Sequence, residues 1–266
     1  LCGDPQAPSG EWRIAIKRED AGRGGSRAAH EQLQMGRICE LGQPRNQFEL
    51  RAGSGRVVLV AGGIGVTPLL AMAHALHHQE RPFELHLCAR CERALPFGDE
   101  LSALPFRDAI RTHLDDGPAQ QAWAAASLPV WQSGDTLYLC GPAGFMACVI
   151  EQARVRGWPD QQVVTETFVA AVADPALDHA FTAVLQRSGR SVEVPAGGSL
   201  LEALQGQGIE LVASCTQGLC GACAVPVIDG EVDHRDRVLG PRRDAPDRLM
   251  TTCVSRARGE RIVLDL

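Results

Sequence analysis

Four cysteines in the C-terminal third of the chain follow a spacing that constrains what the chain can fold into. Cys215, Cys220 and Cys223 fall within nine residues, and Cys253 completes the pattern C-x4-C-x2-C-x29-C. Four thiolates at this spacing hold a 2Fe–2S cluster. Three ligands on one tight loop surround one side of the cluster, and a distant fourth closes it from another element. The fold must therefore bring two separate segments together around one inorganic group.

The residues between the cysteines fit a loop wrapped around inorganic sulfide. Gly218 and Gly221 allow the positive φ angles that turn backbone N–H groups inward, and Ala222 and Ala224 let the chain approach closely. A structural zinc site is the alternative. Zinc sites prefer two close cysteine pairs, whereas Cys253 has no second cysteine near it.

Length and composition indicate a multi-domain globular protein. The chain has 266 residues, enough for about two domains of ~100–200 residues each. With 45% hydrophobic and 22% charged residues it has an ordinary globular composition. The net charge of −6 gives no basic patch for nucleic acid. Apolar runs such as 57–61 are too short for the ~18 residues of a membrane span.

The other cysteines and the missing secretion signal favour a reducing cytoplasm over a disulfide-bonded protein. Cys39, Cys88, Cys140 and Cys148 lie in apolar runs, where we expect small buried hydrophobes. The sequence also has no initiator methionine and opens within what reads as a strand. We therefore expect the chain to begin inside a domain.

The region around the four cysteines predicts a β-grasp domain over about residues 178–266. It reads as two strands, a helix, a strand pair turning at Asp229-Gly230, a dipeptide suited to hairpins, and a closing strand. The predicted elements are, in order, residues 180–187, 190–194, 199–206, 222–233 and 260–266.

Residues 54–168 alternate strand and helix, which predicts a doubly wound α/β domain. Residues 56–63 form a continuous apolar run, the mark of a parallel strand buried on both faces. The further predicted strands are residues 83–90, 110–116, 136–142 and 163–168, and the predicted helices are residues 63–79, 95–104 and 143–157.

Two segments of this domain are candidates for nucleotide binding. In "GGIGVTP", residues 62–68, the glycines let the backbone meet a diphosphate at a helix N-terminus. We expect Thr67 to cap that helix and Pro68 to sit where its missing N–H costs nothing. The loop is not a G-x-G-x-x-G fingerprint, and Arg90 rather than an acid ends the second strand. Tight turns also use glycine for purely structural reasons.

The second segment is "CGP", residues 140–142, at the C-terminal end of a later strand, where ligands bind in such sheets. Cys140 equally suits a packed core thiol, because a catalytic thiol needs a basic partner. Nearer the N-terminus, residues 13–19 alternate as a strand, and residues 36–50 give a further strand and a loop. Between them, "GRGGSR" at 22–27 suits a phosphate ahead of a helix, or else is a solvated flexible turn.

The whole chain resembles the phthalate dioxygenase reductase family, whose layout vanillate demethylase reductase shares. The resemblance runs from "LCGD" and "GRGGS" through "PRNQFEL", "VAGGIGVTP", "CGP" and "ETF" to the four cysteines of the plant-type ferredoxin pattern, "DHRDRVL" and the final "VLDL". It implies a multi-domain β, α/β and α+β chain. The implied parts are a partial FMN-binding barrel at 1–53, an NAD-binding α/β domain at 54–168, a linker at 169–177 and a ferredoxin domain at 178–266.

The resemblance implies an NADH-dependent flavin iron–sulfur oxidoreductase, the reductase component of a Rieske-type oxygenase system. Electrons pass from NADH through FMN and a 2Fe–2S cluster to the oxygenase. NADH gives two electrons at once and a cluster accepts one, so a flavin must lie between them. No side chain need act as a general base.

The resemblance also assigns residues to each cofactor. For FMN, the phosphate is held by Gly24, Gly25 and Ser26, and the flavin is lined by Ala15, Ile16 and Lys17. For the nucleotide and flavin, the bordering residues are Gly63, Gly65, Thr67 and Pro68. For the nicotinamide site, the shaping residues are Cys140, Gly141 and Pro142, with Phe168 against the isoalloxazine. Cys140 and Phe168 are the residues expected nearest the chemistry.

One departure concerns the flavin. The family's R-x-Y-S motif precedes its "L-C", and the sequence given opens at Leu1, so it does not include that segment. We expect an N-terminally truncated flavin domain, and a chain that carries iron and little FMN. The alternatives are a non-catalytic iron–sulfur carrier fragment without flavin and a flavin-free nucleotide-binding module. We expect a cytoplasmic monomer with no nucleic-acid or membrane partner.

Overall fold

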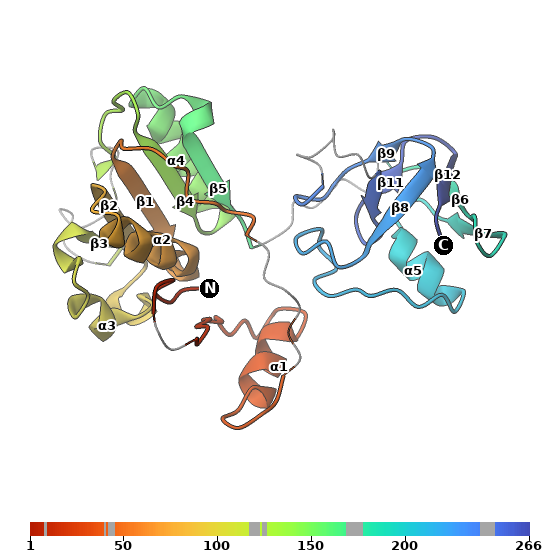
Figure 1. Cartoon of the computed structure of the whole chain (residues 1–266), viewed down its shortest axis with the longest axis horizontal. Coiled ribbons are helices and arrows are strands. Elements are labelled where there is room, and N and C mark those ends of the chain that lie inside the picture. Colours follow the sequence, from red (N-terminus) through yellow and green to blue (C-terminus); the bar gives the residue numbers. More distant parts are fainter. Residues whose placement is uncertain are drawn as a thin grey trace. The chain divides into compact units, whose positions relative to one another are not determined.

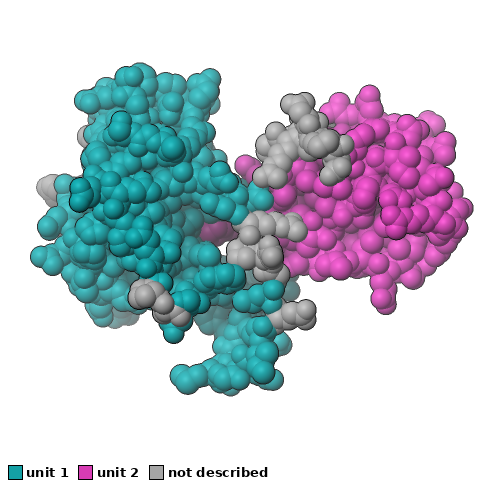
Figure 2. All heavy atoms as spheres, viewed as in Figure 1, with its two compact units in different colours: residues 1–167 teal, residues 168–266 magenta. Residues whose placement is uncertain are grey.

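The structure is a computed structural model that describes residues 1–7, 10–39, 41, 46–116, 123, 127–168, 178–239 and 248–266. The chain divides into two compact units, Leu1–Thr167 and Phe168–Leu266 (Figure 2). The linker predicted at 169–177 lies outside the described residues.

The first unit is built on a parallel five-stranded sheet with the order β3-β2-β1-β4-β5 (Figure 1). Every pair of neighbours in it is parallel. The strands are β1 Val57–Gly62, β2 Phe83–Ala89, β3 Ile110–Leu114, β4 Thr136–Cys140 and β5 Val163–Glu166. From β1 the chain first adds β2 and β3 on one side, and then adds β4 and β5 on the other side of β1. The predicted doubly wound fold is confirmed, with its switch point between β1 and β4.

Helices cover both faces of this sheet because β1 is apolar on both. Leu59 and Ala61 share one core with α2, while Val58 and Val60 share another with α4. All six residues of β1 are buried, as the apolar run predicted. The helical elements are α2 Val66–His78, α3 Gly98–Ser102 and α4 Ala143–Val155, with short turns η1 Gly63–Gly65, η2 Glu92–Ala94, η3 Arg107–Ala109 and η6 Asp160–Gln162.

Residues 1–53 hold one regular element among those described, the helix α1 Gly25–Gln32. The strand predicted at 13–19 is wrong, because these residues have no regular structure and pair with no strand. No strand occurs at the described residues of 36–50 either. Alternating polarity is a local property, whereas a strand exists only by hydrogen bonding to a neighbour. The flavin barrel at 1–53 stays a prediction.

The second unit carries a mixed five-stranded sheet with the order β10-β8-β12-β6-β7. Strand β6, the first of these strands in the sequence, pairs parallel with β12, the last in the sequence, and antiparallel with β7. The strands are β6 Phe181–Leu185, β7 Arg190–Val194, β8 Ala224–Asp229, β10 Leu249–Thr251 and β12 Arg261–Leu264. The helix α5 Leu200–Gly206 begins at Ser199 with a reciprocal capping box to Glu202. The predicted β-grasp elements are present.

The hairpin predicted at Asp229-Gly230 is wrong. After Gly230 the chain forms β9 Val232–Asp233, which pairs with β11 Arg256–Ala257 in a separate two-stranded sheet. Strand β8 already has β10 and β12 as neighbours, so it offers no free edge to the chain that follows it.

Burial corrects two of the cysteine predictions. Cys39 and Cys148 are exposed, whereas Cys140 is buried and Cys88 partly buried. An apolar neighbourhood in sequence does not decide which way one side chain on a helix or an extended segment points. Within the described part of the chain, no helix is both long and apolar enough to cross a membrane.

Candidate functional site

The four predicted cluster ligands come from two segments of the second unit. Cys215, Cys220 and Cys223 lie on the loop between α5 and β8, and Cys253 lies in the turn after β10. The thiols meet in two pairs: Cys215 with Cys220, and Cys223 with Cys253. The fold therefore brings the distant fourth cysteine to the loop that carries the other three.

Backbone N–H groups of the loop point at the sulfur atoms. Gln217 and Leu219 donate to Cys215 Sγ at 3.3 and 3.4 Å, and Ala222 donates to Cys220 Sγ at 3.4 Å. Gly218 and Gly221 have φ angles of 68° and 70°, the left-handed conformation that the sequence predicted for these glycines. N–H donors around sulfur stabilise thiolates, and they also tune the reduction potential of a cluster that those thiolates bind.

Each pair contains a thiol whose electrostatic surroundings favour the anion. A hydrogen bond from the Cys253 thiol lowers the pKa of Cys223 to about 6, and the same contact raises the pKa of Cys253. Burial acts to raise the pKa of Cys215, but the N–H donors of Gln217 and Leu219 and the contacts with Cys220 together outweigh it, and the pKa is lowered. Thiolate is the form that ligates metal.

The donor set fits a two-iron cluster better than a zinc ion. Within the described ranges no three His, Cys, Asp or Glu side chains converge on one point as ligands of a single ion, whereas structural zinc needs four ligands about one centre. The two sulfur pairs would supply two ligands to each iron of a 2Fe–2S cluster. Cys223 and Cys253 are also buried and pack against Leu201, which screens that side of the site from water.

In the first unit, the two predicted nucleotide segments are in direct contact. A Cβ on Gly65 would lie 2.2 Å from the Cys140 carbonyl oxygen, and a Cβ on Gly141 would lie 3.0 Å from the Gly62 Cα. Only glycine allows these two loops to touch. Gly63 differs, since its φ is +53° and a Cβ there would meet nothing within 4 Å. Its backbone therefore borders open space at the end of β1.

The start of α2 differs from the prediction. The N-cap is Gly65, and no side chain caps the helix. Thr67 lies inside the first turn, where its Oγ1 donates to the Ile64 carbonyl oxygen at 3.0 Å. The turn η1 continues directly into the helix, so the capping position falls two residues before Thr67. Pro68 stays within the first turn, where its missing N–H costs little.

Cys140 stands beside an acid that the sequence analysis did not single out. Burial, with a smaller contribution from the Glu166 charge, raises the pKa of Cys140 to about 12. Cys140 and Glu166 are register partners on β4 and β5, and burial raises the pKa of Glu166. At neutral pH Cys140 is therefore a neutral thiol. The motif "ETF" at the end of a strand was the signal for Glu166.

The residues predicted for FMN lie on an exposed segment. Ser26 Oγ donates to the Glu19 carbonyl oxygen at 3.3 Å and accepts from the Glu19 N–H at 3.0 Å. Lys17 pairs with the Glu19 carboxylate. Gly24 has a φ of 97° at the N-cap of α1, and α1 begins at Gly25, inside the predicted phosphate loop. Of the other predicted residues, Ala15 is partly buried, while Ile16 and Phe168 are 37% and 44% exposed.

The first unit also has a cavity of about 310 Å³ that borders none of the predicted site residues. Its walls come from the N-terminal segment, α2 and the α3 region. Arg13, which lines the cavity, pairs with Glu100 at 2.7 Å and lies over the Phe97 ring. This contact anchors the N-terminal segment on the sheet domain.

Comparisons with known proteins agree with this organisation. The family of the 2Fe-2S iron-sulfur cluster binding domain matches residues 183–258. The chain is 42% identical over 267 residues to the vanillate O-demethylase oxidoreductase of Pseudomonas sp. (strain HR199 / DSM 7063), covering 100% of this chain and 84% of that relative.

Two solved structures are similar over nearly the whole chain. The first is phthalate dioxygenase reductase, described as a modular structure for electron transfer from pyridine nucleotides to 2Fe–2S. It is 36% identical with a TM-score of 0.63, covering 94% of this chain and 78% of that one. The second is an intact type IV self-sufficient cytochrome P450 monooxygenase, 36% identical with a TM-score of 0.81. There the match covers 100% of this chain and 34% of the larger protein.

Proposed function

Because the chain belongs to the family of oxygenase reductases that includes vanillate O-demethylase oxidoreductase and phthalate dioxygenase reductase, we propose that it passes electrons from NADH through FMN and a 2Fe–2S cluster to an oxygenase. The observation that carries the cluster step is the pairing of Cys215 with Cys220 and of Cys223 with Cys253 on converging segments. Full-length similarity to reductases of oxygenase systems supports the remainder.

The chain's own residues would bind and orient the three groups. Bound FMN supplies the conversion of a two-electron donor into one-electron steps. The four cysteines hold the cluster, and the loop N–H groups stabilise its sulfur ligands. Gly63 leaves room for the diphosphate at the end of β1, while Cys140 and Gly141 shape the nicotinamide end and Phe168 covers the flavin. Gly24, Gly25 and Ser26 bind the FMN phosphate, and Ala15, Ile16 and Lys17 line the flavin.

We propose a Rieske-type oxygenase as the acceptor, in keeping with the family that the motifs resemble. A cytochrome P450 is the second candidate, because the chain is similar over its full length to part of a self-sufficient P450. We further propose a monomer located in the cytoplasm. The net charge of −6 supports the absence of a nucleic-acid partner.

The proposal is tested with the purified chain, reconstituted anaerobically with iron, sulfide and FMN. We expect 2Fe–2S absorption bands. Bound flavin together with NADH-driven reduction of cytochrome c, a one-electron acceptor, would show the full electron path and would overturn the expectation of little FMN. Cys220→Ser should lose the cluster bands and cytochrome c reduction.

The outcomes separate the alternatives. Cluster bands without flavin or NADH oxidation would favour the iron–sulfur carrier, and flavin-free NADH binding without iron would favour the nucleotide-binding module. Iron retained by Cys220→Ser at the wild-type level would refute the ligand assignment. Parallel assays with a Rieske-type oxygenase and a P450 as acceptors distinguish the two partner classes.

A further inference from the structure

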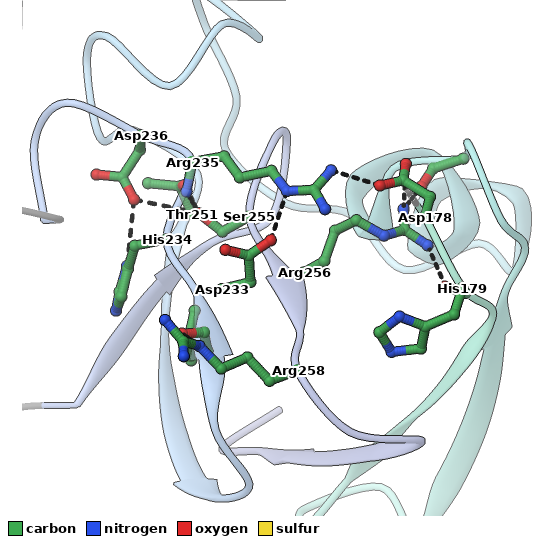
Figure 3. A network of polar contacts seen from close by, with 12 residues as sticks. Asp178, His179, Asp233, His234, Arg235, Asp236, Thr251, Ser255, Arg256 and Arg258 are labelled. Atoms are coloured by element: carbon green, nitrogen blue, oxygen red, sulfur yellow. Dashed lines mark hydrogen bonds and ion pairs between the residues drawn. The ribbon is translucent and has the colours of Figure 1, made fainter. Parts of the chain in front are cut away.

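A buried carboxylate, Asp236, belongs to a network of polar contacts in the second unit (Figure 3), and it lies where the two ligand-bearing segments approach each other. Its Oδ1 accepts from the Val238 N–H at 2.9 Å and from the Leu239 N–H. Its Oδ2 accepts from Ser255 Oγ at 3.1 Å, and His234 Nδ1 lies 3.3 Å away. The residue is 7% exposed. Burying a carboxylate is costly unless hydrogen-bond donors compensate it. Here the donors to Oδ1 and Oδ2 supply that compensation.

Asp236 touches the cluster loop through the backbone. The next residue, Arg237, donates its N–H to the Gly218 carbonyl oxygen at 2.9 Å. A Cβ on Gly218 would lie 3.0 Å from the Asp236 Cα and 2.6 Å from Val254 Cγ2. Gly218 belongs to the loop of the first three cysteines, and Val254 follows the fourth.

Asp236 also reaches the segment of the fourth cysteine through Ser255. Ser255 Oγ lies 2.8 Å from Thr251 Oγ1, and the Thr252 N–H donates to the Cys223 carbonyl oxygen at 3.2 Å. The turn that carries Cys253 is thus held on one side by the Cys223 backbone and on the other by Asp236.

The segment that carries Asp236 is itself fixed from its other side. Arg235 donates to Asp178 at 2.6 Å and to Asp233 at 2.7 Å, and Arg256 Nη1 lies 3.8 Å from the Asp178 carboxylate. Figure 3 shows these ion pairs facing away from the side on which Asp236 contacts Ser255. Because its segment is anchored in this way, the Asp236 carboxylate has a fixed position from which it can hold the Ser255 hydroxyl.

We propose that Asp236 is the positioning residue of the cluster site, which clamps the loop of Cys215, Cys220 and Cys223 against the turn of Cys253. The inference rests on the 2Fe–2S site of the proposed function. An acid suits this role because its two oxygens accept from two backbone N–H groups and one hydroxyl at the same time. Hydrogen-bonded partners behind metal ligands commonly determine ligand orientation and metal affinity.

The test measures how firmly the chain holds its cluster, and it needs neither flavin nor NADH. Asp236→Ala, Asp236→Asn and Ser255→Ala are reconstituted with iron and sulfide beside the wild type. The matched control is Asp265→Ala, which removes a carboxylate paired with Arg187 at 2.6 Å. The measurements are bleaching of the visible bands by a chelator, iron per chain, and the EPR spectrum of the dithionite-reduced cluster.

We expect Asp236→Ala to bleach at least about tenfold faster than the wild type and to shift the EPR signal. Asp236→Asn keeps one acceptor oxygen for the backbone and a polar group toward Ser255, so it should stay within about threefold of the wild type. Ser255→Ala loses one hydrogen bond and should fall between them. Asp265→Ala should match the wild type.

Asp236→Ala that bleaches no faster than Asp265→Ala, with an unchanged EPR spectrum, would overturn the inference and leave the cluster assignment intact. If Asp236→Ala fails to fold, Ser255→Ala decides, and a wild-type bleaching rate in that variant overturns the inference. A wild-type chain that takes up no iron would instead refute the cluster site itself.

Discussion

Acid should destabilise the first unit through a buried histidine, His86 on β2. The side chain is 3% exposed. Its Nδ1 lies 3.0 Å from His113 Nε2, and its Nε2 lies 3.5 Å from Glu84. The His86 and His113 rings stack with centroids 5.3 Å apart, and Trp123 stands edge-on to both. This cluster has no room for a hydrated imidazolium.

Burial, followed by the charge of His113, lowers the pKa of His86 from 6.5 to about 4. The unfolded chain therefore takes up a proton before the folded chain does. The stabilisation is fully present above the unfolded pKa and is lost as pH falls from about 6.5 toward 4. Linkage between these two pKa values gives a loss of about 2.5 kcal/mol between pH 8 and pH 4.5.

Urea titrations at pH 8 and pH 4.5 measure this loss in the first unit alone, because all four tryptophans, at positions 12, 123, 131 and 158, lie within residues 1–167. His86→Asn keeps a polar atom near the Nδ1 position and cannot be protonated. Its free energy of unfolding should therefore fall by about 2.5 kcal/mol less than that of the wild type between pH 8 and pH 4.5. The control His179→Ala, in the second unit, should keep the wild-type slope. Equal slopes for the wild type and His86→Asn would refute the reasoning.

Three further substitutions test contacts described above. Gly65→Ala puts a methyl group 2.2 Å from the Cys140 carbonyl oxygen, so we expect a loss of about 2–3 kcal/mol in the same urea assay; wild-type stability would mean that the two loops do not touch. Asp135→Ala removes the nearer of two carboxylate partners of Arg56, at 2.6 Å against 3.3 Å for Glu84, and should cost about 2 kcal/mol, whereas a loss near zero would show that this ion pair contributes no more than an exposed one. Gly218→Ala forces a side chain into a φ of +68° and should prevent cluster assembly while the tryptophan signal stays unchanged; normal iron content would contradict it.

Local patterns predicted those parts of the fold that are determined locally. The apolar run of β1 indicated burial on both faces, and the cysteine spacing with Gly218 and Gly221 indicated the loop conformation that the structure shows. Pairing is not local, and there the sequence was insufficient. Residues 13–19 alternate correctly yet pair with no strand, and Asp229-Gly230 is a suitable turn whose hairpin partner position is already occupied.

The same limit applies to the sites. Gly65 was predicted to let a diphosphate approach, but its Cβ position faces the Cys140 carbonyl, so loop packing alone requires glycine there. The "DHRDRVL" segment was visible as a motif. Its role depends on Gly218 and Ser255, which lie far from it in sequence and meet Asp236 only in the folded unit.

The position of β12 in the second sheet has a consequence for biosynthesis. This strand lies between β6 and β8, although residues 261–264 are made after everything else in the sheet. The first unit has all five of its strands once residue 166 has been synthesised, so it can fold while translation continues. The thiols at 215, 220, 223 and 253 leave the ribosome before the sheet that orders them can close. Assembly of the cluster in its folded site therefore follows the synthesis of β12, and until then the nascent thiols are open to oxidants and to other metal ions.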